Sequence, residues 1–289
     1  YPVASGVYVI DDKLIEDTAA GKGGMEHPSN LGVQLARELQ KEFGGRIFMV
    51  DPPCVDELCD MARMTGIDGV PRHTNMHALN LRGVAMHHAK HVLGKKYEDC
   101  CFIVCHIDGG ISVSAHRYGR IIDCNDAAGG DGPYTPTRIG SVSVADILEY
   151  VRDKDIDEVK KLCTRTGGFV SHFGTSSSDA VHKMAEEGNK KAIRVWDGMK
   201  YQIVKYIGAM AAVLGGRVDG ILLTGGLLRF EDITQTIREQ CEWIAPVSTY
   251  PGEVEHEALA AGALRVLRGE EEPKHYTGRP VWDGWHDED

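Results

Sequence analysis

Residues 102–125 carry the clearest pattern of apolar and polar positions in the chain. An apolar run at 102–107 meets the turn Asp108-Gly109-Gly110, and an alternating run follows from Ile111. A third apolar run, at 120–124, comes after a second glycine turn. Three such runs joined by glycine turns predict an antiparallel meander. From the residues alone, the Gly-Gly turn is either a plain hairpin connection or a loop whose bare N–H groups bind an anion.

Two further buried strands end at residues suited to chemistry. The strand at 46–50 runs directly into Asp51, and the strand at 218–224 opens into Gly225-Gly226 before a helix. Open α/β folds place their ligands at the carboxyl ends of such strands, and a strand–loop–helix unit presents backbone N–H groups to a nucleotide. Asp51 is therefore a candidate catalytic carboxylate, with the alternative that it only caps the next turn.

Helices are predicted wherever apolar residues recur with the helical period. In the helix at 30–43 we expect a buried stripe formed by Leu31, Val33, Leu35, Ala36 and Leu39. We expect His87, His88 and His91, in the helix at 77–93, to be solvated surface residues. The predicted helices are 13–20, 30–43, 54–65, 77–93, 143–152, 156–163, 179–214 with a break at 187–188, and a last helix that ends at Leu267.

Residues 125–140 form a long loop rich in glycine and aspartate. Long irregular loops inside a folded domain are usually functional or disordered. Arg138 lies in this loop and is a candidate anion clamp, because a guanidinium group matches the geometry of phosphate and carboxylate. The alternative is an exposed surface arginine.

Composition and charge narrow the class of protein. Hydrophobic residues make up 42% of the 289 residues and charged residues 26%, which is ordinary for a soluble globular protein. The net charge of −11 argues against a nucleic-acid or anionic-membrane partner. The sequence has no apolar stretch of transmembrane length, and we expect no signal peptide. Its eight cysteines have no repeated C-x-x-C spacing, so we expect free thiols in the cytoplasm.

Several segments, taken together, resemble the butyrate kinase branch of the acetate kinase family, whose members form acyl phosphates. They are residues 26–32 (Glu-His-Pro-Ser-Asn-Leu-Gly), 50–52 (Val-Asp-Pro), 77–80 (His-Ala-Leu-Asn), 109–113 (Gly-Gly-Ile-Ser-Val), 119–123 (Gly-Arg-Ile-Ile-Asp), 132–136 (Gly-Pro-Tyr-Thr-Pro), 201–210, 223–226 (Leu-Thr-Gly-Gly), 250–253 (Tyr-Pro-Gly-Glu) and 262–269.

The resemblance implies an α/β, actin-like and sugar-kinase-like (ribonuclease H-like) fold of two domains. We expect the first domain to be incomplete, because the chain starts at Tyr1-Pro2 without the family's N-terminal strands and their Asn-x-Gly-Ser loop. The expected domains are 1–98, the remainder of the N-terminal domain, and 99–270, a C-terminal nucleotide-binding domain. An acidic tail at 271–289 follows. Relatives associate, so we expect a homo-oligomer.

The resemblance also implies roles for residues of this chain. The turn at Asp108, Gly109 and Gly110 is expected to bind phosphate, although Asp108 stands where the family usually has glycine. The remaining implied roles are adenosine binding for Gly225 and Gly226, a place near the nucleotide for Asp179, catalysis for Asp51, stabilisation of the transferred phosphoryl group for Arg138, phosphate contacts for His73 and His77, and a magnesium link for Glu255.

The implied chemistry needs these residue types. A carboxylate approaches the γ-phosphoryl group of ATP only if arginine and Mg²⁺ neutralise the negative field, and Asp51 and Glu255 are the expected metal carboxylates. No general base is needed, since a carboxylate is already ionised at neutral pH. We therefore expect reversible, ATP-dependent phosphorylation of a short-chain fatty acid to an acyl phosphate. The alternative is a non-catalytic nucleotide-binding protein, or an inactive fragment of such a kinase.

Overall fold

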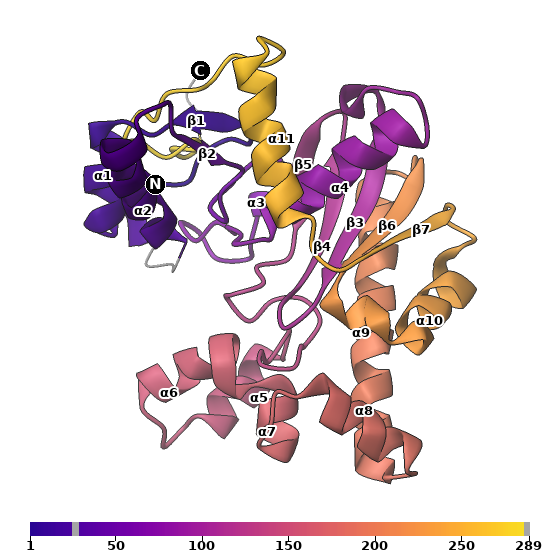
Figure 1. The fold of residues 1–289 in the computed structure, drawn as a ribbon. Coiled ribbons are helices and arrows are strands. Elements are labelled where there is room, and N and C mark those ends of the chain that lie inside the picture. Colours follow the sequence, from indigo (N-terminus) through magenta and orange to yellow (C-terminus); the bar gives the residue numbers. More distant parts are fainter. Residues whose placement is uncertain (25–28, 286–289) are drawn as a thin grey trace. The chain divides into compact units, whose positions relative to one another are not determined.

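The computed structural model describes residues 1–24 and 29–285, which group into two units (Figure 1). The first unit consists of residues 1–57, 77–83 and 254–289, and the second of residues 58–76 and 84–253. Part of the 26–32 motif and the last four residues of the acidic tail lie outside the described residues. The α/β fold class expected from the sequence is confirmed, since helices pack on a mixed sheet.

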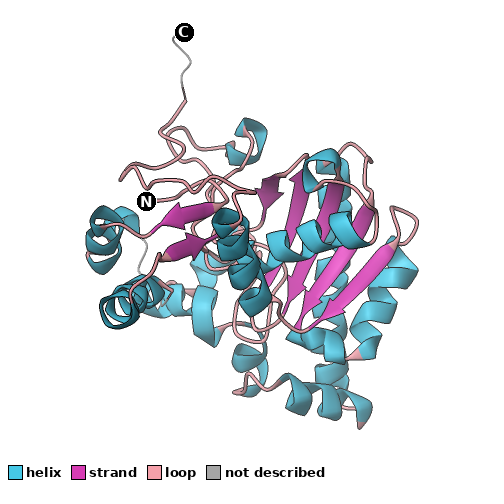
Figure 2. Cartoon of the chain, turned by 45° about the horizontal axis from the view of Figure 1, so that its top comes forward, coloured by secondary structure: helices cyan, strands magenta, loops and turns pink. Residues whose placement is uncertain are grey.

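A five-stranded mixed sheet forms the centre of the second unit (Figure 2). Its strand order is β5-β4-β3-β6-β7, and the 102–125 meander is confirmed as three antiparallel strands. β6 and β7 extend the sheet in parallel from β3. The strands are β3 (Cys101–Ile107), β4 (Ile111–Arg117), β5 (Arg120–Cys124), β6 (Gly220–Gly225) and β7 (Val247–Pro251).

Helices cover both faces of this sheet because its strands alternate their side chains between two apolar layers. Ile103, Cys105 and Ile107 of β3 pack into a core with α9 and α10. Phe102 points to the other face, where its ring lies 5.5 Å from that of His88 in α4. The helices on the two faces are α8 (Ser178–Glu186), α9 (Lys190–Val213) and α10 (Glu231–Cys241) on one, and the second half of α4 (Ala78–His91) on the other.

The break predicted at 187–188 is confirmed between α8 and α9. Gly188 has a φ of +85°, a conformation that favours glycine, and the Asn189 side chain caps α9 by accepting the N–H groups of Lys191 and Ala192. The apolar stripe of α9 is buried at Trp196, Met199, Ile203, Ile207 and Met210, whereas Ile193 remains 39% exposed.

The remaining elements of the second unit are short. They are α3 (Asp60–Arg63), η2 (Tyr97–Asp99), α5 (Val144–Tyr150), α6 (Ile156–Lys161), η3 (Leu162–Thr166), α7 (Gly168–Phe173) and η4 (Gly226–Arg229). The helix predicted at 54–65 is thus wrong over most of its length, because Val55 instead forms a β-bridge with Val3 in the first unit.

The first unit has a two-stranded antiparallel sheet of β1 (Val7–Val9) and β2 (Phe48–Val50). Lys274 of the C-terminal tail lies along β1 and exchanges backbone hydrogen bonds with Val7 and Val9. Helices α1 (Asp12–Ala19), η1 (Lys22–Gly24), α2 (Asn30–Phe43) and α11 (Glu255–Leu267) complete this unit. α11 packs on β2 so closely that a Cβ atom added at Gly262 would lie 2.6 Å from Val50 Cγ1.

The buried stripe predicted for α2 is wrong at its three leucines. Val33 is buried, but Leu31, Leu35 and Leu39 are 71%, 57% and 46% exposed. The reason is that a polar face of α2 contacts α1: Gln34 Nε2 donates to the backbone oxygen of Ile15 at 3.0 Å.

Two further observations concern the cysteines and the membrane-spanning potential of the helices. All eight cysteines are free thiols, and five of them are buried. Among the described residues, no helix has the length and apolar character needed to span a membrane.

Candidate functional site

The two glycine turns predicted from the sequence meet at the carboxyl edge of the second unit's sheet. The parallel register of β3 and β6 pairs His106 with Thr224, so the turns that follow the two strands are neighbours. Gly225 has a φ of +108°, and a Cβ atom there would lie 2.3 Å from the Ile107 carbonyl oxygen. This close approach admits only glycine.

The side chain of Asp108 joins the two turns. Its Oδ1 accepts the N–H of Gly109 at 2.7 Å, and its Oδ2 accepts the N–H of Gly226 at 2.6 Å. A Cβ atom at Gly226 would lie 2.5 Å from Asp108 Oδ2, so this contact also depends on a glycine. Asp108, Gly109, Gly225 and Gly226, to which the resemblance gives nucleotide-binding roles, are thus brought together. The hydrogen bonds made by the carboxylate were not predicted.

The loop that carries Arg138 is fastened to the first turn. The hydroxyl groups of Thr135 and Thr137 both donate to the backbone oxygen of Gly109, at 2.7 and 3.2 Å. The backbone oxygen of Arg138 accepts the N–H of Thr135 at 3.1 Å. These bonds fix the loop beside Asp108-Gly109-Gly110.

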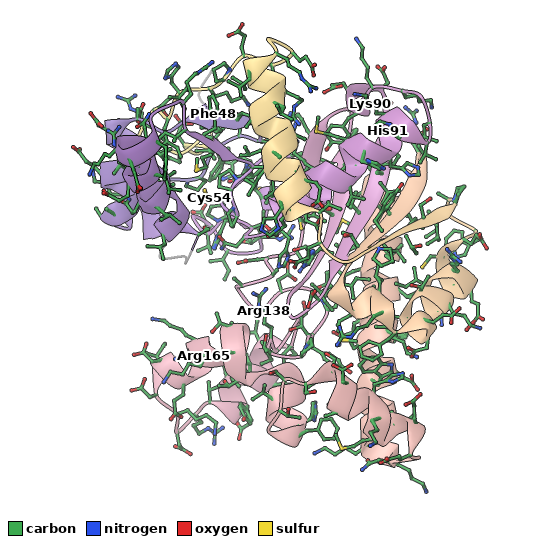
Figure 3. The ribbon with its side chains drawn as sticks, in the orientation of Figure 1. Phe48, Cys54, Lys90, His91, Arg138 and Arg165 are labelled. Carbon is green, nitrogen blue, oxygen red and sulfur yellow. The ribbon has the colours of Figure 1, made fainter. Side chains whose placement is uncertain are left out.

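Arg138 itself is a half-buried cation (Figure 3). Its Nη1 donates to the backbone oxygen of Ala127 at 2.7 Å, while its buried Nε has no hydrogen-bond partner in the part of the chain that the structure describes. Burial lowers the pKa of Arg138, and Asp126 partly offsets the effect. A buried guanidinium with an unsatisfied donor is suited to an anion, and this fits the predicted clamp better than a surface arginine.

A group of three titratable residues at the same edge was not predicted. A ring nitrogen of His106 and one carboxylate oxygen each of Asp108 and Glu253 all lie within 4.8 Å of one another. Burial, followed by the charge of Arg138, lowers the pKa of His106 to about 4, so its imidazole is neutral at physiological pH. The available signal was the position of His106 near the carboxyl end of the apolar run 102–107 and of Glu253 in the 250–253 motif.

His73 and Asp179 each reach the site through a charged neighbour. His73 is exposed, and its Nε2 lies 3.7 Å from Oδ2 of Asp126, the acid that also acts on Arg138. Asp179 forms an exposed ion pair with Arg229 at 2.9 Å, and Arg229 donates to the backbone oxygen of Gly226 at 2.8 Å. The hydrogen bond from Arg229 lowers the pKa of Asp179. Arg229 was missed, although it follows the Gly225-Gly226 turn by three residues.

Asp51 belongs to the first unit and is buried at the end of β2. Arg82 Nη1 donates to both of its oxygens, at 2.7 and 2.9 Å, and Gly6 N–H donates to Oδ1 at 2.6 Å. Burial raises the pKa of Asp51, and the ion pair with Arg82 offsets part of this rise. Its φ of +39° is unusual for a residue other than glycine, and such strain is typical of functional positions. Arg82 was not predicted, and it lies on α4 beyond the His-Ala-Leu-Asn motif.

His77 and Glu255 also belong to the first unit. His77 immediately precedes α4, and the half-buried Glu255 is the first residue of α11. The two helix starts are held together because Asn80 Oδ1 accepts the N–H of Val254 at 3.1 Å. The 77–80 motif and the predicted magnesium glutamate therefore lie side by side.

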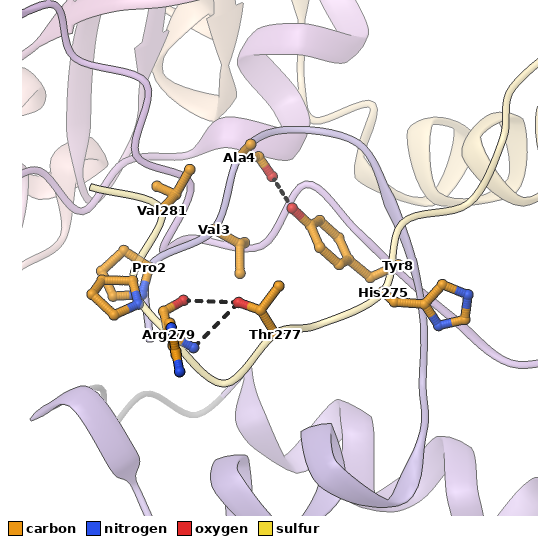
Figure 4. A pocket seen from close by; sticks show the side chains of 9 residues that line it. Pro2, Val3, Ala4, Tyr8, His275, Thr277, Arg279 and Val281 are labelled. Atoms are coloured by element: carbon orange, nitrogen blue, oxygen red, sulfur yellow. Dashed lines mark hydrogen bonds between the residues drawn. The ribbon is translucent and has the colours of Figure 1, made fainter. Parts of the chain in front are cut away.

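A pocket of about 580 Å³ in the first unit contains none of the predicted site residues (Figure 4). Tyr8 closes one side of it, with its hydroxyl group donating to the Ala4 oxygen at 2.9 Å. The lining residues are Pro2, Val3, Ala4, Tyr8, His275, Thr277, Arg279, Pro280 and Val281.

Comparison with known proteins links this arrangement to a family. The chain matches the model of the acetokinase family over residues 70–248. It is 42% identical over 277 residues to butyrate kinase 1 of Clostridium acetobutylicum and 45% identical over 277 residues to a probable butyrate kinase of Listeria monocytogenes. Each match covers 95% of this chain and 78% of the relative, so both relatives are longer.

Solved structures show the same fold. The chain matches acetate kinase from Porphyromonas gingivalis with a TM-score of 0.79 and 20% identity, over 91% of this chain and 75% of that one. It matches a propionate kinase from Francisella tularensis with a TM-score of 0.74 and 16% identity, over 90% and 75%. The family model, the curated relatives and the fold agree with the resemblance seen in the sequence, and the chain belongs to the acetokinase family.

Proposed function

We propose that this protein catalyses the reversible, ATP-dependent phosphorylation of a short-chain carboxylate, such as butyrate, to an acyl phosphate. The observation that carries the proposal is the pair of glycine turns at the carboxyl edge of the sheet, with the Arg138 loop fastened to the first turn. The relatives named butyrate kinases support the choice of substrate class.

The described residues divide the work between binding and charge stabilisation. Backbone N–H groups of the 108–110 and 225–226 turns would bind the nucleotide, with Asp179 held beside the second turn through Arg229. The unsatisfied Nε of Arg138 would stabilise charge that develops on the transferred phosphoryl group. His73 and His77 would contact phosphate oxygens. The attacking carboxylate is ionised at neutral pH, so no residue is assigned as a base.

Asp51 and Glu255 are the residues we assign to Mg²⁺. Carboxylate oxygens suit this ion, and Glu255 is half-buried at the start of a helix. The oxygens of Asp51 already accept bonds from Arg82 and Gly6, which favours a contact through water. When bound, the ion would supply positive charge that screens the phosphates from the incoming carboxylate. We also expect a cytoplasmic homo-oligomer, and light scattering of the purified protein tests the oligomeric state.

A coupled assay tests the proposed reaction directly. Acyl phosphate formation is measured with acetate, propionate, butyrate and isobutyrate, each with ATP and Mg²⁺. We expect turnover with at least one of the four acids and none without ATP. ATP binding without any acyl phosphate would contradict the proposal.

That negative outcome would favour the second candidate, a nucleotide-binding protein without turnover. One observation favours it: the Asp108 carboxylate already accepts two N–H groups of the glycine turns. The assay on the Asp108→Ala protein separates the two candidates, because an active variant would show that the remaining catalytic residues are competent.

A further inference from the structure

The backbone donors of the two glycine turns are engaged by a side chain of the protein itself. Gly109 N–H and Gly226 N–H both point at the Asp108 carboxylate, at 2.7 and 2.6 Å. Glycine turns at the end of a buried strand ordinarily leave such groups available to a ligand anion. Here one carboxylate takes a donor from each turn.

A carboxylate is a chemical substitute for a phosphate in this position. Both groups are anions whose oxygens accept short, charge-assisted hydrogen bonds from backbone N–H groups. A nucleotide phosphate that approached Gly109 and Gly226 would have to replace the Asp108 oxygens, since each N–H group donates one strong bond.

The charges around the carboxylate oppose a second anion. Glu253 contributes another carboxylate within 4.8 Å, and His106 beside them is neutral because burial lowers its pKa to about 4. The cations at this edge include Arg138, whose charge acts on His106, and Arg229, which donates to the Gly226 oxygen. Arg229 is already paired with Asp179, and Asp126 acts on Arg138, so the charge of both cations is already offset in part.

We propose that Asp108 is an internal anion that occupies the phosphate-binding position of the two turns and competes with the β- and γ-phosphates of the nucleotide. This inference rests on the proposed function. It makes Asp108 a residue that sets the protein's preference between phosphorylated nucleotides and the uncharged nucleoside.

Removing the carboxylate is expected to strengthen the binding only of ligands that carry phosphate groups. Asp108→Ala and Asp108→Gly should bind ATP and ADP about tenfold to a hundredfold more tightly, which is the range of a charged hydrogen bond. Their affinity for adenosine, which has no phosphate, should match that of the unchanged protein. Isothermal titration calorimetry without added metal measures all three ligands. Asp108 does not have a positive φ, so alanine can take its place without backbone strain. The alanine variant removes the carboxylate without adding the flexibility of a glycine.

Two further variants separate donor competition from the general electric field. Asp108→Asn keeps the shape and leaves one carbonyl oxygen as an acceptor, so an intermediate gain is expected. Glu253→Gln removes a nearby charge while the Asp108 carboxylate keeps its bonds from Gly109 and Gly226, so it should give a smaller gain. Glu239→Gln, on α10, should change nothing. A Glu253→Gln gain as large as that of Asp108→Ala would assign the effect to the field and overturn the inference.

If Asp108 instead holds the two turns in the conformation that binds nucleotide, every Asp108 variant should bind ATP more weakly. Weaker or unchanged ATP binding, or none in any of the proteins, overturns the inference. The acyl phosphate assay is read separately. Tighter ATP binding by Asp108→Ala without acyl phosphate from either protein would support the inference while contradicting the proposed function.

Discussion

Arg138 gives a prediction at the scale of one residue, because its loop is fastened to the first glycine turn and its buried Nε has no hydrogen-bond partner among the described residues. Arg138→Ala is expected to lower kcat by about 10²–10³-fold and to leave KM nearly unchanged, because its contact strengthens only as charge develops. Steady-state kinetics with varied carboxylate and ATP measures both constants. Arg165, an exposed arginine on the neighbouring η3 segment (Figure 3), provides the control, and Arg165→Ala should be fully active. A rise in KM alone would contradict the assigned role.

His88 gives a prediction about acid stability. It is 3% exposed, its Nδ1 lies 2.6 Å from the Tyr250 hydroxyl oxygen, and burial followed by the charge of His87 lowers its pKa. The unfolded chain therefore binds a proton more readily than the folded protein, so the free energy of unfolding should fall as pH drops below about 6.5. Urea unfolding of the protein and of His88→Gln, above and below that pH, measures this. The variant should lose less stability on acidification. An equal loss in both would contradict the assignment.

The burial of His88 and the hydrogen bond between Gly226 and Asp108 were not predicted, and for the same physical reason. His88 was expected at the surface because it lies off the apolar stripe of its own helix, yet Phe102 and Tyr250 cover it from two strands. The hydrogen bond from Gly226 to Asp108 joins residues 118 positions apart. Local periodicity contains no information about such partners. The glycines and Arg138 could be proposed from the sequence because their expected chemistry depends on residue type and local turn geometry.

At the scale of elements, two glycines test the packing of their helices. Gly262→Ala should destabilise the protein by about 1–3 kcal/mol, since the new Cβ atom would lie 2.6 Å from Val50 Cγ1. Gly208→Ala in α9 meets nothing within 4 Å and should stabilise it by up to about 1 kcal/mol. Chemical denaturation of both variants measures these changes in the free energy of unfolding. Equal effects would show that α11 does not pack on β2 as described.

The orientation of α2 is tested by a second pair of substitutions. Leu35→Lys should change stability by no more than about 0.5 kcal/mol, because Leu35 is 57% exposed. Val33→Ala should cost about 2 kcal/mol, because Val33 is 5% exposed. The free energies of unfolding of both proteins provide the measurement, and a larger cost at Leu35 would restore the stripe expected from the sequence.

Element types were predicted better than the partners of elements. The meander, the α8–α9 break and the strands at 46–50 and 218–224 follow from local turn chemistry and apolar runs. The face that α2 buries did not follow, because the polar residue Gln34 hydrogen-bonds to α1. A helix with apolar residues on more than one side has no unique inward face until its neighbour is known.

At the scale of the whole molecule, the chain does not divide into continuous pieces. The expected boundary at 98/99 stays a prediction about domains, but contacts assign residues 77–83 and 254–289 to the first unit. α11 follows the last strand of the large sheet in sequence and packs on β1 and β2 instead. Such a return of the chain has no signature in composition. The family, in contrast, was visible in short motifs spread over the whole length, and its identification is confirmed.

The parallel pairing of β3 with β6 has a consequence for the order in which the protein is made. Phe102 of β3 pairs with Gly220 of β6. More than a hundred residues must therefore be synthesised after β3 before its second neighbour in the sheet is available. Until then the nascent meander presents an unpaired, apolar strand edge, and contacts of such long range form slowly. The time between translation of β3 and closure of the sheet is therefore the period in which this chain is most exposed to aggregation.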